Sequence, residues 1–317
     1  MNIVITGGSG FIGTHLVDRL LDDGHDVRIF DKRPSEAFAD LVTLGDVRDQ
    51  AAMTSALRGV DVVYHLAAEH HDDVRPVSRY YEVNVGGAEN LVAACDANGV
   101  RRVIFTSSSA VYGLSSGVAD ESAEPRPFND YSKSKLQAEH VLGAWMSTGQ
   151  DKSLFIVRPV VVFGEGNTAN VYNLIQQISR GRFVMVGTGE NKKSMCYVGN
   201  IVLFLAQVVD RNDGEDVVNY ADKPDLSVGD IVGIIRDELG DSEEALRRIP
   251  YWLGLLGGYS YDVMARLTKR RYTISGVRVK KFCASTQVTT SVFEGMGFQA
   301  PWTLEEGLRR MIASLPS

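Results

Sequence analysis

The chain has 317 residues, of which 44% are hydrophobic and 23% are charged, and its formal net charge is −7. This composition is that of a globular protein with a large core, and the acidic balance disfavours nucleic acid and anionic membranes as partners. The three cysteines lack metal-ligand spacing, and no apolar run approaches the roughly 20 residues of a membrane span. We therefore expect a cytoplasmic protein with reduced thiols and no membrane span.

The first predicted element is a buried strand at residues 3–6, followed by a glycine turn and an amphipathic helix that starts at Phe11. Gly7, Gly10 and Gly13 have the spacing of a dinucleotide-binding fingerprint. In that fingerprint the first glycine permits a tight turn, the second lets backbone amides approach a pyrophosphate, and the third lets helix and strand pack closely. Because a helix N-terminus also attracts phosphate, the sequence predicts a dinucleotide site.

A second strand is predicted at residues 26–30, and Asp31 follows its end. A carboxylate at this place can accept hydrogen bonds from the adenosine ribose hydroxyls and repel a 2′-phosphate, which favours NAD. Lys32 and Arg33 come directly after it and could instead attract that phosphate. The prediction is NAD, with NADP left open.

Buried strands and helices then alternate along the chain. Strands are predicted at residues 41–44, 60–65, 102–106, 153–158 and 217–220, and helices at 50–57, 76–98, 131–145, 170–180, 198–209 and 228–239. Such alternation predicts an α/β fold with a doubly wound parallel (Rossmann) sheet.

The rhythm loosens beyond Pro159, and the strand at 217–220 is expected to return to the sheet edge. We therefore expect an NAD-binding domain of residues 1–163 together with 199–221. Residues 164–198 and 222–317 would form a smaller, mostly helical substrate lobe.

Residues 250–267 form an apolar segment that includes Trp252, Leu253 and Leu256. Its scattered glycines and the absence of a basic face favour a lid or core helix over a helix lying on a membrane.

The sequence Tyr131-Ser-Lys-Ser-Lys135 at a helix start places a tyrosine and a lysine on one helical face. A phenol is a poor base at neutral pH, but a neighbouring ammonium would lower its pKa. Tyr131 could then take a proton from a substrate hydroxyl while hydride leaves to the cofactor, or do the reverse. Serines 107–109 follow the strand at 102–106, and a hydroxyl there can hold the reacting oxygen against Tyr131.

In their order along the chain these motifs resemble the extended short-chain dehydrogenase/reductase family, in particular its nucleotide-sugar epimerases and dehydratases. The resemblance covers nearly the whole chain and rests on residues 6–13, 31, 46–47, 65–68, 84, 107–113, 131–135 and 158–159.

This resemblance implies that Ser108, four residues before Tyr112, acts with Tyr131 and Lys135 in catalysis, and that Asn84 supports the site. It also implies a set of cofactor-binding residues: Gly7, Gly10, Phe11, Ile12, Gly13, Asp31, Lys32, Asp46, Val47, Leu66, Ala67, Ala68, Tyr131, Lys135 and Val160.

Ser109 and Ala110 stand where the family's sugar 4,6-dehydratases have an Asp-Glu pair, so dehydration is disfavoured. The Ser-Ser-Ala sequence is instead similar to UDP-sugar 4-epimerases, which oxidise the C4 hydroxyl, rotate the ketose and return the hydride, so that NAD is regenerated.

The likeness also places Asn170, Lys193 and Arg278 near the substrate's diphosphate. The positive charges of Lys193 and Arg278 would attract this anionic group. Val161, however, replaces an asparagine of the UDP-hexose epimerases, which argues against a UDP-hexose as the substrate.

We predict an NAD-dependent nucleotide-sugar 4-epimerase with a UDP-linked substrate, which the resemblance implies is a homodimer through helices 76–98 and 131–145. The same residues could serve a reductase or dehydrogenase of a keto-sugar nucleotide, or of a steroid-like or isoprenoid-like alcohol suited to the apolar segment 250–267. A non-catalytic nucleotide sensor is a third hypothesis, although such family members usually lack the tyrosine or the lysine.

No metal is expected, because the adjacent His70 and His71 point different ways on most backbones.

Overall fold

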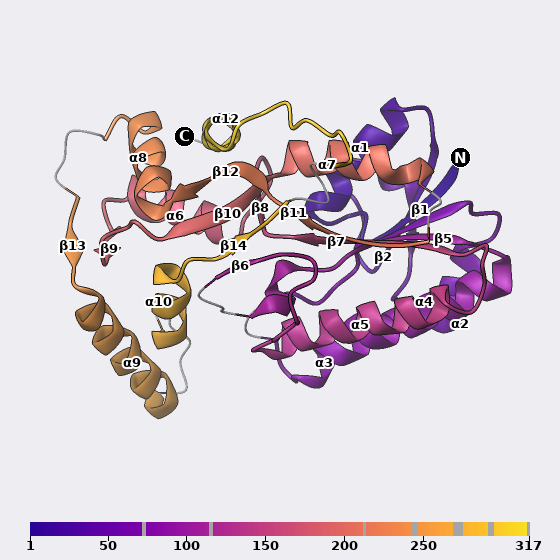
Figure 1. The fold of residues 1–317 in the computed structure, drawn as a ribbon, viewed down its shortest axis with the longest axis horizontal. Helices are drawn as coiled ribbons and strands as arrows, with labels where there is room; N and C mark the ends of the chain where they lie inside the picture. Colours follow the sequence, from indigo (N-terminus) through magenta and orange to yellow (C-terminus); the bar gives the residue numbers. More distant parts are fainter. Residues whose placement is uncertain are drawn as a thin grey trace.

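The structure is a computed structural model that describes residues 1–71, 74–113, 117–211, 214–241, 246–268, 275–290 and 295–315. Its larger part is a seven-stranded parallel sheet in the order β11-β7-β5-β4-β1-β2-β3 (Figure 1). The strands are β1 (Asn2–Thr6), β2 (Asp26–Asp31), β3 (Val42–Leu44), β4 (Val62–His65), β5 (Arg102–Thr106), β7 (Ser153–Pro159) and β11 (Glu215–Tyr220). The predicted α/β fold with a doubly wound sheet is confirmed.

Helices cover both faces of this sheet, as Figure 1 shows. On one face lie α1 (Phe11–Asp22) and α7 (Val198–Gln207), and on the other α2 (Gln50–Ala56), α4 (Gly86–Asn98) and α5 (Asp130–Met146). Successive side chains of β1 alternate between the two faces, so Ile3 and Ile5 join the core under α1 and α7, while Val4 joins the opposite core. Burial on both faces explains the continuous apolar runs of these strands.

The long helix expected at residues 76–98 is present from Ser78 to Asn98, but its helical type changes along its length. The structure has a short α3 (Ser78–Tyr80), then a π-helical turn (Tyr81–Val85), and only then α4. A π-helical turn inserts one residue into the helical repeat and is often found at functional sites.

The return of the chain to the sheet edge is confirmed, because β11 pairs in parallel with β7 from Glu215 opposite Leu154 to Tyr220 opposite Pro159. The division of the chain into two domains at the expected residues stays a prediction.

The remaining elements form a smaller body beside the sheet. It contains α6 (Asn170–Ser179), α8 (Val228–Glu238), α9 (Tyr251–Thr268), α10 (Gly276–Cys283) and α12 (Leu304–Ala313). It also contains a three-stranded sheet of β12 (Asp222–Ser227), β10 (Lys192–Tyr197) and β8 (Val161–Phe163), and two strand pairs: β13 (Arg248–Ile249) with β9 (Met185–Val186), and β14 (Gln287–Val288) with β6 (Val118–Ala119). The expected helices at 170–180, 198–209 and 228–239 are present, whereas the short strands were not predicted.

Helix α9 projects from the body together with α10 (Figure 1). Most of its described large apolar side chains, including Trp252 and Leu256, are exposed, so the expectation of a core helix is wrong, whereas the lid role stays a prediction. Across the described ranges, no helix has the length and apolar character needed to cross a membrane.

The contact between α1 and the glycine turn yields a first prediction. A methyl group on Gly13 would lie 2.5 Å from the Gly7 carbonyl oxygen and 2.6 Å from Gly8 Cα, so Gly13→Ala must push the helix away from the turn. We expect a loss of about 1–3 kcal/mol in the free energy of unfolding and weakened NAD binding, measured by thermal melts and calorimetric titration.

Gly233→Ala is the matched control, because Gly233 lies inside α8 with open space where its methyl group would go. This change should be neutral or stabilising by roughly 0.5–1 kcal/mol. Equal melting temperatures and NAD affinities for the two variants would contradict the close-packing role of Gly13.

Candidate active site

The turn between β1 and α1 forms a cradle that leaves no room for side chains. Gly7 has φ +74°, and a Cβ atom on it would lie 2.7 Å from the Ala67 backbone nitrogen. Helix α1 follows with Gly10 as its N-cap and no capping side chain. Since neither a side chain nor a cap fills the space before the helix, its first N–H groups suit a pyrophosphate, and the turn fits a dinucleotide.

Asp31 lies buried at the end of β2, beside this cradle. Its carboxylate accepts hydrogen bonds from the backbone N–H of Ser9 at 3.2 Å and of Arg33 at 3.0 Å. The neighbouring Lys32 ammonium lies 3.9 Å from the Glu69 carboxylate. The fixed carboxylate and the partly neutralised lysine both favour the unphosphorylated ribose of NAD.

The predicted adenine-side residues lie in the loop after β3. The side chain of Arg48 makes two hydrogen bonds to Asp46, which lower the pKa of that carboxyl. Val47 is buried and packs against Gly87 of α4. A Cβ atom added to Gly87 would lie 3.0 Å from the Val47 side chain. In this structure Asp46 is held by Arg48, so its contact with adenine stays a prediction.

The segment after β4 is fixed to the end of β1. Leu66 donates its backbone N–H to the Thr6 carbonyl at 3.0 Å, and the Thr6 hydroxyl lies 2.7 Å from His65 Nδ1. Burial, with a smaller effect of Lys135, lowers the pKa of His65 to about 3, so the imidazole is neutral. The predicted nicotinamide-side residues Leu66, Ala67 and Ala68 are thereby held next to the glycine turn.

Tyr131 and Lys135 lie one turn apart at the start of α5. The helix begins sharply because Asn129 and Ser132 form a reciprocal capping box. The Lys135 ammonium is buried and lies 4.1 Å from the centre of the Phe105 ring. Burial lowers the pKa of Lys135 to about 7, although the Glu139 carboxylate opposes the shift. The geometry thus places a lysine that titrates near neutral pH on the same helical face as the tyrosine.

The serines after β5 have different surroundings. The Ser107 hydroxyl is buried and donates a short hydrogen bond to the Glu139 carboxylate. Ser108 is half-buried, and its hydroxyl oxygen caps the following 3₁₀ turn by accepting the Ala110 N–H at 3.2 Å. Because the structure uses Ser107 internally, it supports Ser108 as the hydroxyl available to a substrate.

A buried ion pair lies beneath these serines. Arg158 of β7 donates to Glu139 of α5 through Nε at 3.0 Å and Nη2 at 2.6 Å, and to the Tyr112 hydroxyl at 2.8 Å. Burial alone would lower the pKa of Arg158, but the bonds to Glu139 raise it above its usual value, so it stays charged.

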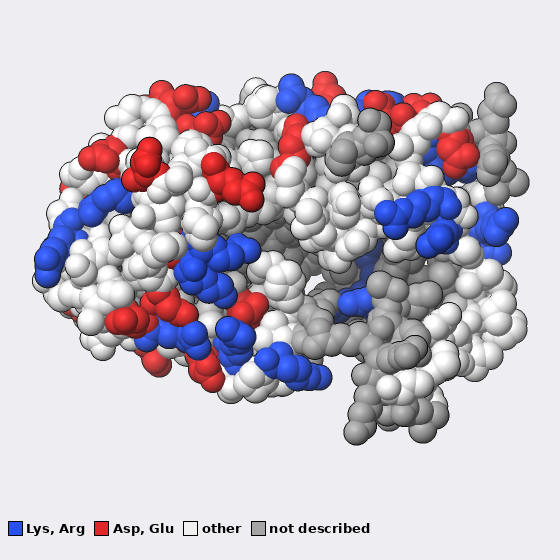
Figure 2. Space-filling model, turned by 180° about the vertical axis from the view of Figure 1, so that it is seen from behind, with Lys and Arg blue, Asp and Glu red and all other residues white. Residues whose placement is uncertain are grey.

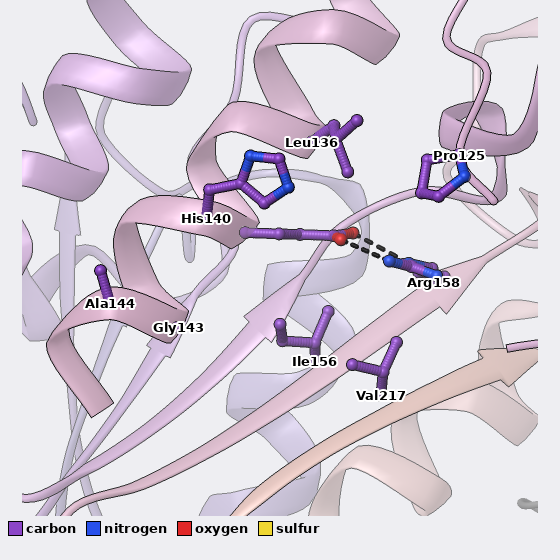
Figure 3. A pocket seen from close by; sticks show the side chains of 9 residues that line it. Pro125, Leu136, His140, Gly143, Ala144, Ile156, Arg158 and Val217 are labelled. Atoms are coloured by element: carbon purple, nitrogen blue, oxygen red, sulfur yellow. Dashed lines mark hydrogen bonds and ion pairs between the residues drawn. The ribbon is translucent and has the colours of Figure 1, made fainter. Parts of the chain in front are cut away.

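Both residues of this ion pair line a pocket of about 350 Å³, which Figure 3 shows from close by. Arg158 points into it, and dashed lines mark its bonds to the Glu139 carboxylate. None of Ser108, Tyr131 and Lys135 contributes to its walls, so it is separate from the predicted catalytic group. The walls consist of Pro125, Leu136, Glu139, His140, Gly143, Ala144, Ile156, Arg158 and Val217.

Asn84 lies in the π-helical turn and links three segments of the site. Its carbonyl oxygen accepts the Glu69 N–H at 2.8 Å, and its amide nitrogen donates to the Ser134 hydroxyl at 2.8 Å. Ser134 in turn donates to the Tyr131 carbonyl at 2.8 Å. The π-helical turn therefore aims Asn84 at the start of α5, which agrees with the predicted supporting role.

The three predicted substrate residues are spread over the smaller body. Asn170 is exposed as the first residue of α6, and Arg278 is exposed on α10. The Lys193 ammonium donates to the carbonyl oxygens of Lys281, at 2.8 Å, and Ala284, and burial lowers its pKa to about 8. Lys193 thus anchors the segment after α10 in this structure, and its contact with a diphosphate stays a prediction.

A second pocket, of about 910 Å³, lies between β9, β13 and the pair α9 and α10, and sequence reasoning missed it. The available signal in the sequence was the Gly187-Thr-Gly189 spacing, and both glycines have positive φ in the structure. The walls consist of Val186, Gly187, Thr188, Asn191, Arg248, Ile249, Pro250, Tyr251, Lys280, Cys283 and Ala284. Among the residues that the structure describes, no three potential metal ligands lie together.

Residues 3–221 match the family model described as the NAD dependent epimerase/dehydratase family. This match spans more than half of the chain and includes the glycine cradle, Ser108, Tyr131 and Lys135. The chain belongs to the NAD dependent epimerase/dehydratase family.

Within the family, the chain is 47% identical to the N-acetyl-alpha-D-glucosaminyl-diphospho-ditrans,octacis-undecaprenol 4-epimerase of Escherichia coli O157:H7, over 98% of this chain and 94% of that protein. It is 30% identical to the UDP-glucose 4-epimerase of Vibrio cholerae, with the same shares of the two chains covered. The solved structure of MoeE5 in complex with UDP-glucuronic acid and NAD is 28% identical, covers 99% of this chain and 98% of its own, and superposes with a TM-score of 0.78.

The catalytic assignment is tested by Tyr131→Phe. Removal of the hydroxyl should lower turnover about 100- to 10,000-fold, because proton transfer to and from the substrate is lost. NAD affinity, measured by titration, should stay unchanged. Tyr81→Phe is the control, since the Tyr81 hydroxyl donates to Asp130 at the same helix start and should be dispensable for turnover. Comparable turnover in Tyr131→Phe and Tyr81→Phe would show that Tyr131 does not transfer the substrate proton.

The buried lysine predicts a pH dependence of stability. The pKa of Lys135 falls from 10.5 in the unfolded chain to about 7 in the fold. Between these values the unfolded chain holds a proton that the folded chain has released, so the free energy of unfolding of the cofactor-free protein rises with pH. Lys135→Met should remove up to about 1.4 kcal/mol per pH unit of that rise.

Chemical denaturation from pH 7 to 10 measures this slope. The control is Lys133→Met, because Lys133 is exposed on the same helix. An unchanged slope in Lys135→Met would show that Lys135 keeps its proton throughout this range.

Proposed function

We propose that the chain is a sugar 4-epimerase whose substrate is an N-acetylhexosamine linked through a diphosphate to a polyprenol. The observation that carries this proposal is the 47% identity, over 98% of the chain, to an epimerase with a diphospho-undecaprenol substrate. The predicted nucleotide-linked substrate becomes the second candidate, and it is favoured by the similarity to the UDP-glucose 4-epimerase over the same share of the chain.

The predicted catalytic residues can perform the epimerisation without net oxidation. Bound NAD supplies a reversible acceptor for the hydride of the sugar's C4. As that hydride leaves, Tyr131 takes the C4 hydroxyl proton and Ser108 holds the C4 oxygen. NAD, held by the glycine turn and Asp31, would also return the hydride to the other face of C4 once the 4-keto sugar has rotated, and Tyr131 would then give the proton back. The positive charge of Lys135 stabilises the tyrosinate between the two steps.

The residues after Ser108 argue against water loss from the same 4-keto sugar. Elimination needs an acid and a base beside the sugar, yet Ser109 and Ala110 occupy the first two positions of the 3₁₀ turn Ser109–Tyr112. A hydroxyl of ordinary pKa and a methyl group cannot supply this chemistry. The ketone is therefore left to be reduced again, which completes an epimerisation.

The second pocket supports a diphosphate with an apolar substituent. Arg248 and Lys280 provide positive charge in its walls, while Val186, Ile249 and Tyr251 provide apolar surface. The Lys280 side chain is exposed on α10, whereas Arg248 donates to the Thr188 carbonyl at 3.3 Å. A mixed wall of this kind suits a pyrophosphate that continues into a hydrocarbon.

Two organisational features complete the proposal. The substrate lobe of residues 164–198 and 222–317 presents the sugar to the NAD-binding part. Two copies of the chain associate through α4 and α5, the helices of the predicted dimer interface.

Product analysis on a substrate panel tests the function. The enzyme is incubated with GlcNAc-diphospho-polyprenol in detergent, with UDP-GlcNAc and with UDP-glucose, without reducing equivalents. We expect GlcNAc and GalNAc to interconvert on the polyprenol with no net change in nicotinamide absorbance, and at least about 100-fold slower turnover of the nucleotide sugars, a difference of roughly 2.7 kcal/mol in transition-state binding.

Tyr131→Phe serves as the inactive control for every substrate. Faster turnover of UDP-GlcNAc than of GlcNAc-diphospho-polyprenol would show that the substrate is a nucleotide sugar. A stoichiometric change in reduced nicotinamide would make the protein a reductase or dehydrogenase instead.

A further inference from the structure

Helix α9 carries an apolar stripe on its exposed face. Trp252, Leu256, Tyr259 and Val263 are spaced four, three and four residues apart, which places them on one side of an α-helix. Their exposed fractions are 66%, 59%, 46% and 57%, so water reaches roughly half or more of each side chain. We call these four residues the α9 stripe.

Two glycines lie on the inward face of α9. A Cβ atom on Gly254 would lie 2.4 Å from a methyl carbon of Val186, and one on Gly258 would lie 2.9 Å from Gly276 Cα. The helix therefore packs closely on β9 and α10 at these two glycines, while the four side chains of the α9 stripe are exposed. This arrangement is the reverse of a helix that faces water, where the apolar side is the one that is buried.

The α9 stripe is continuous with the second pocket. Tyr251, at the start of α9, lines that pocket together with Lys280 of α10, and the Lys280 ammonium lies 5.6 Å from the centre of the Tyr259 ring. Figure 2, which shows the molecule from behind, draws part of its lower right in white, the colour of residues other than Lys, Arg, Asp and Glu. The α9 stripe thus begins beside the pocket that suits the diphosphate, with Lys280 at the boundary between them.

We propose that α9 is an interfacial membrane helix whose stripe inserts into a phospholipid bilayer, so that the second pocket opens at the membrane surface. Tryptophan and tyrosine suit this boundary because each combines an apolar ring with a polar group. The choice of a bilayer as the occupant rests on the proposed function, since the polyprenol of the substrate is itself anchored there. Helix α9 lies in the plane of the membrane and does not cross it.

Vesicle co-sedimentation without any substrate tests the membrane contact. Because the stripe carries no formal charge, the protein should sediment with neutral phosphatidylcholine vesicles, and high salt should not release it. The double variant Trp252→Ser/Leu256→Ser should lower the partition coefficient at least about 10-fold, since two apolar side chains are lost from the contact. The fluorescence of Trp252 should shift to the blue on vesicle binding in the parent protein.

Leu44→Ser/Val118→Ser is the matched control, because these two apolar side chains are similarly exposed on β3 and β6. This variant should bind vesicles as the parent protein does. Equal loss of binding in both double variants would overturn the proposal, because it would show general surface adhesion. An unaltered melting temperature of the α9 variant shows that the fold is intact.

Activity assays separate this inference from the proposed function. With a short-chain, water-soluble prenyl-diphospho-GlcNAc the α9 variant should keep its turnover, whereas with the long-chain substrate in vesicles it should lose at least about 10-fold. Vesicle binding through α9 without turnover of either substrate would support the membrane contact of α9 and refute the polyprenyl substrate. Turnover of both by a protein that stays in the supernatant would overturn the membrane contact, as would self-association through the stripe with no vesicle binding.

Discussion

The buried ion pair between Glu139 and Arg158 holds α5, which carries the predicted catalytic residues, on the sheet. The two oxygens of one carboxylate meet two nitrogens of one guanidinium, at 2.6 and 3.0 Å, and both side chains are more than nine-tenths buried. Two buried charges are costly to desolvate, so the pair stabilises this arrangement only while both partners and their hydrogen bonds are in place. The position of α5, and with it of Tyr131 and Lys135, depends on this pair.

The same pair organises the strand ends around Ser108. Ser107 at the end of β5 donates to Glu139, and Arg158 donates to Tyr112, whose hydroxyl donates to Asn219 of β11 at 2.8 Å. Ser108 is thus flanked on both sides along the chain by residues tied to one network. Five parts of the chain contribute to this network, which explains how a serine in a short turn acquires a defined position.

Sequence reasoning succeeded where the chain is regular and local. The parallel strands, the glycine turn and the Tyr-x-x-x-Lys helix each carry a period or a spacing, so the Rossmann sheet and the family were predictable. The π-helical turn at Tyr81–Val85 was not, because one inserted residue barely changes the hydrophobic pattern. Strands of two residues, such as Met185–Val186, are too short to show any period. The partners of Lys193 lie about ninety residues away along the chain, so no local pattern could reveal them.

Helix α9 shows a different limit of structure prediction from sequence. Its apolar residues repeat as they would in a helix packed into a core, and hydrophobic periodicity is the same whether the apolar face meets protein or lipid. The decisive observation is which side Gly254 and Gly258 occupy, and this appears only when Val186 and Gly276 are seen against them. The expectation of a core helix failed for that reason, and the lid role stays a prediction.

The pairing of β11 with β7 limits how the molecule can be divided. Strand β7 is buried along its full length and is covered on one edge by β5 and on the other by β11, which the chain supplies only after passing through the smaller body. A fragment that ended after β8 would leave an apolar strand with a free edge, the arrangement that invites strand addition and aggregation. Folding of the cofactor half therefore has to wait for a strand encoded some sixty residues later, and the two halves cannot be exchanged between relatives as separate modules.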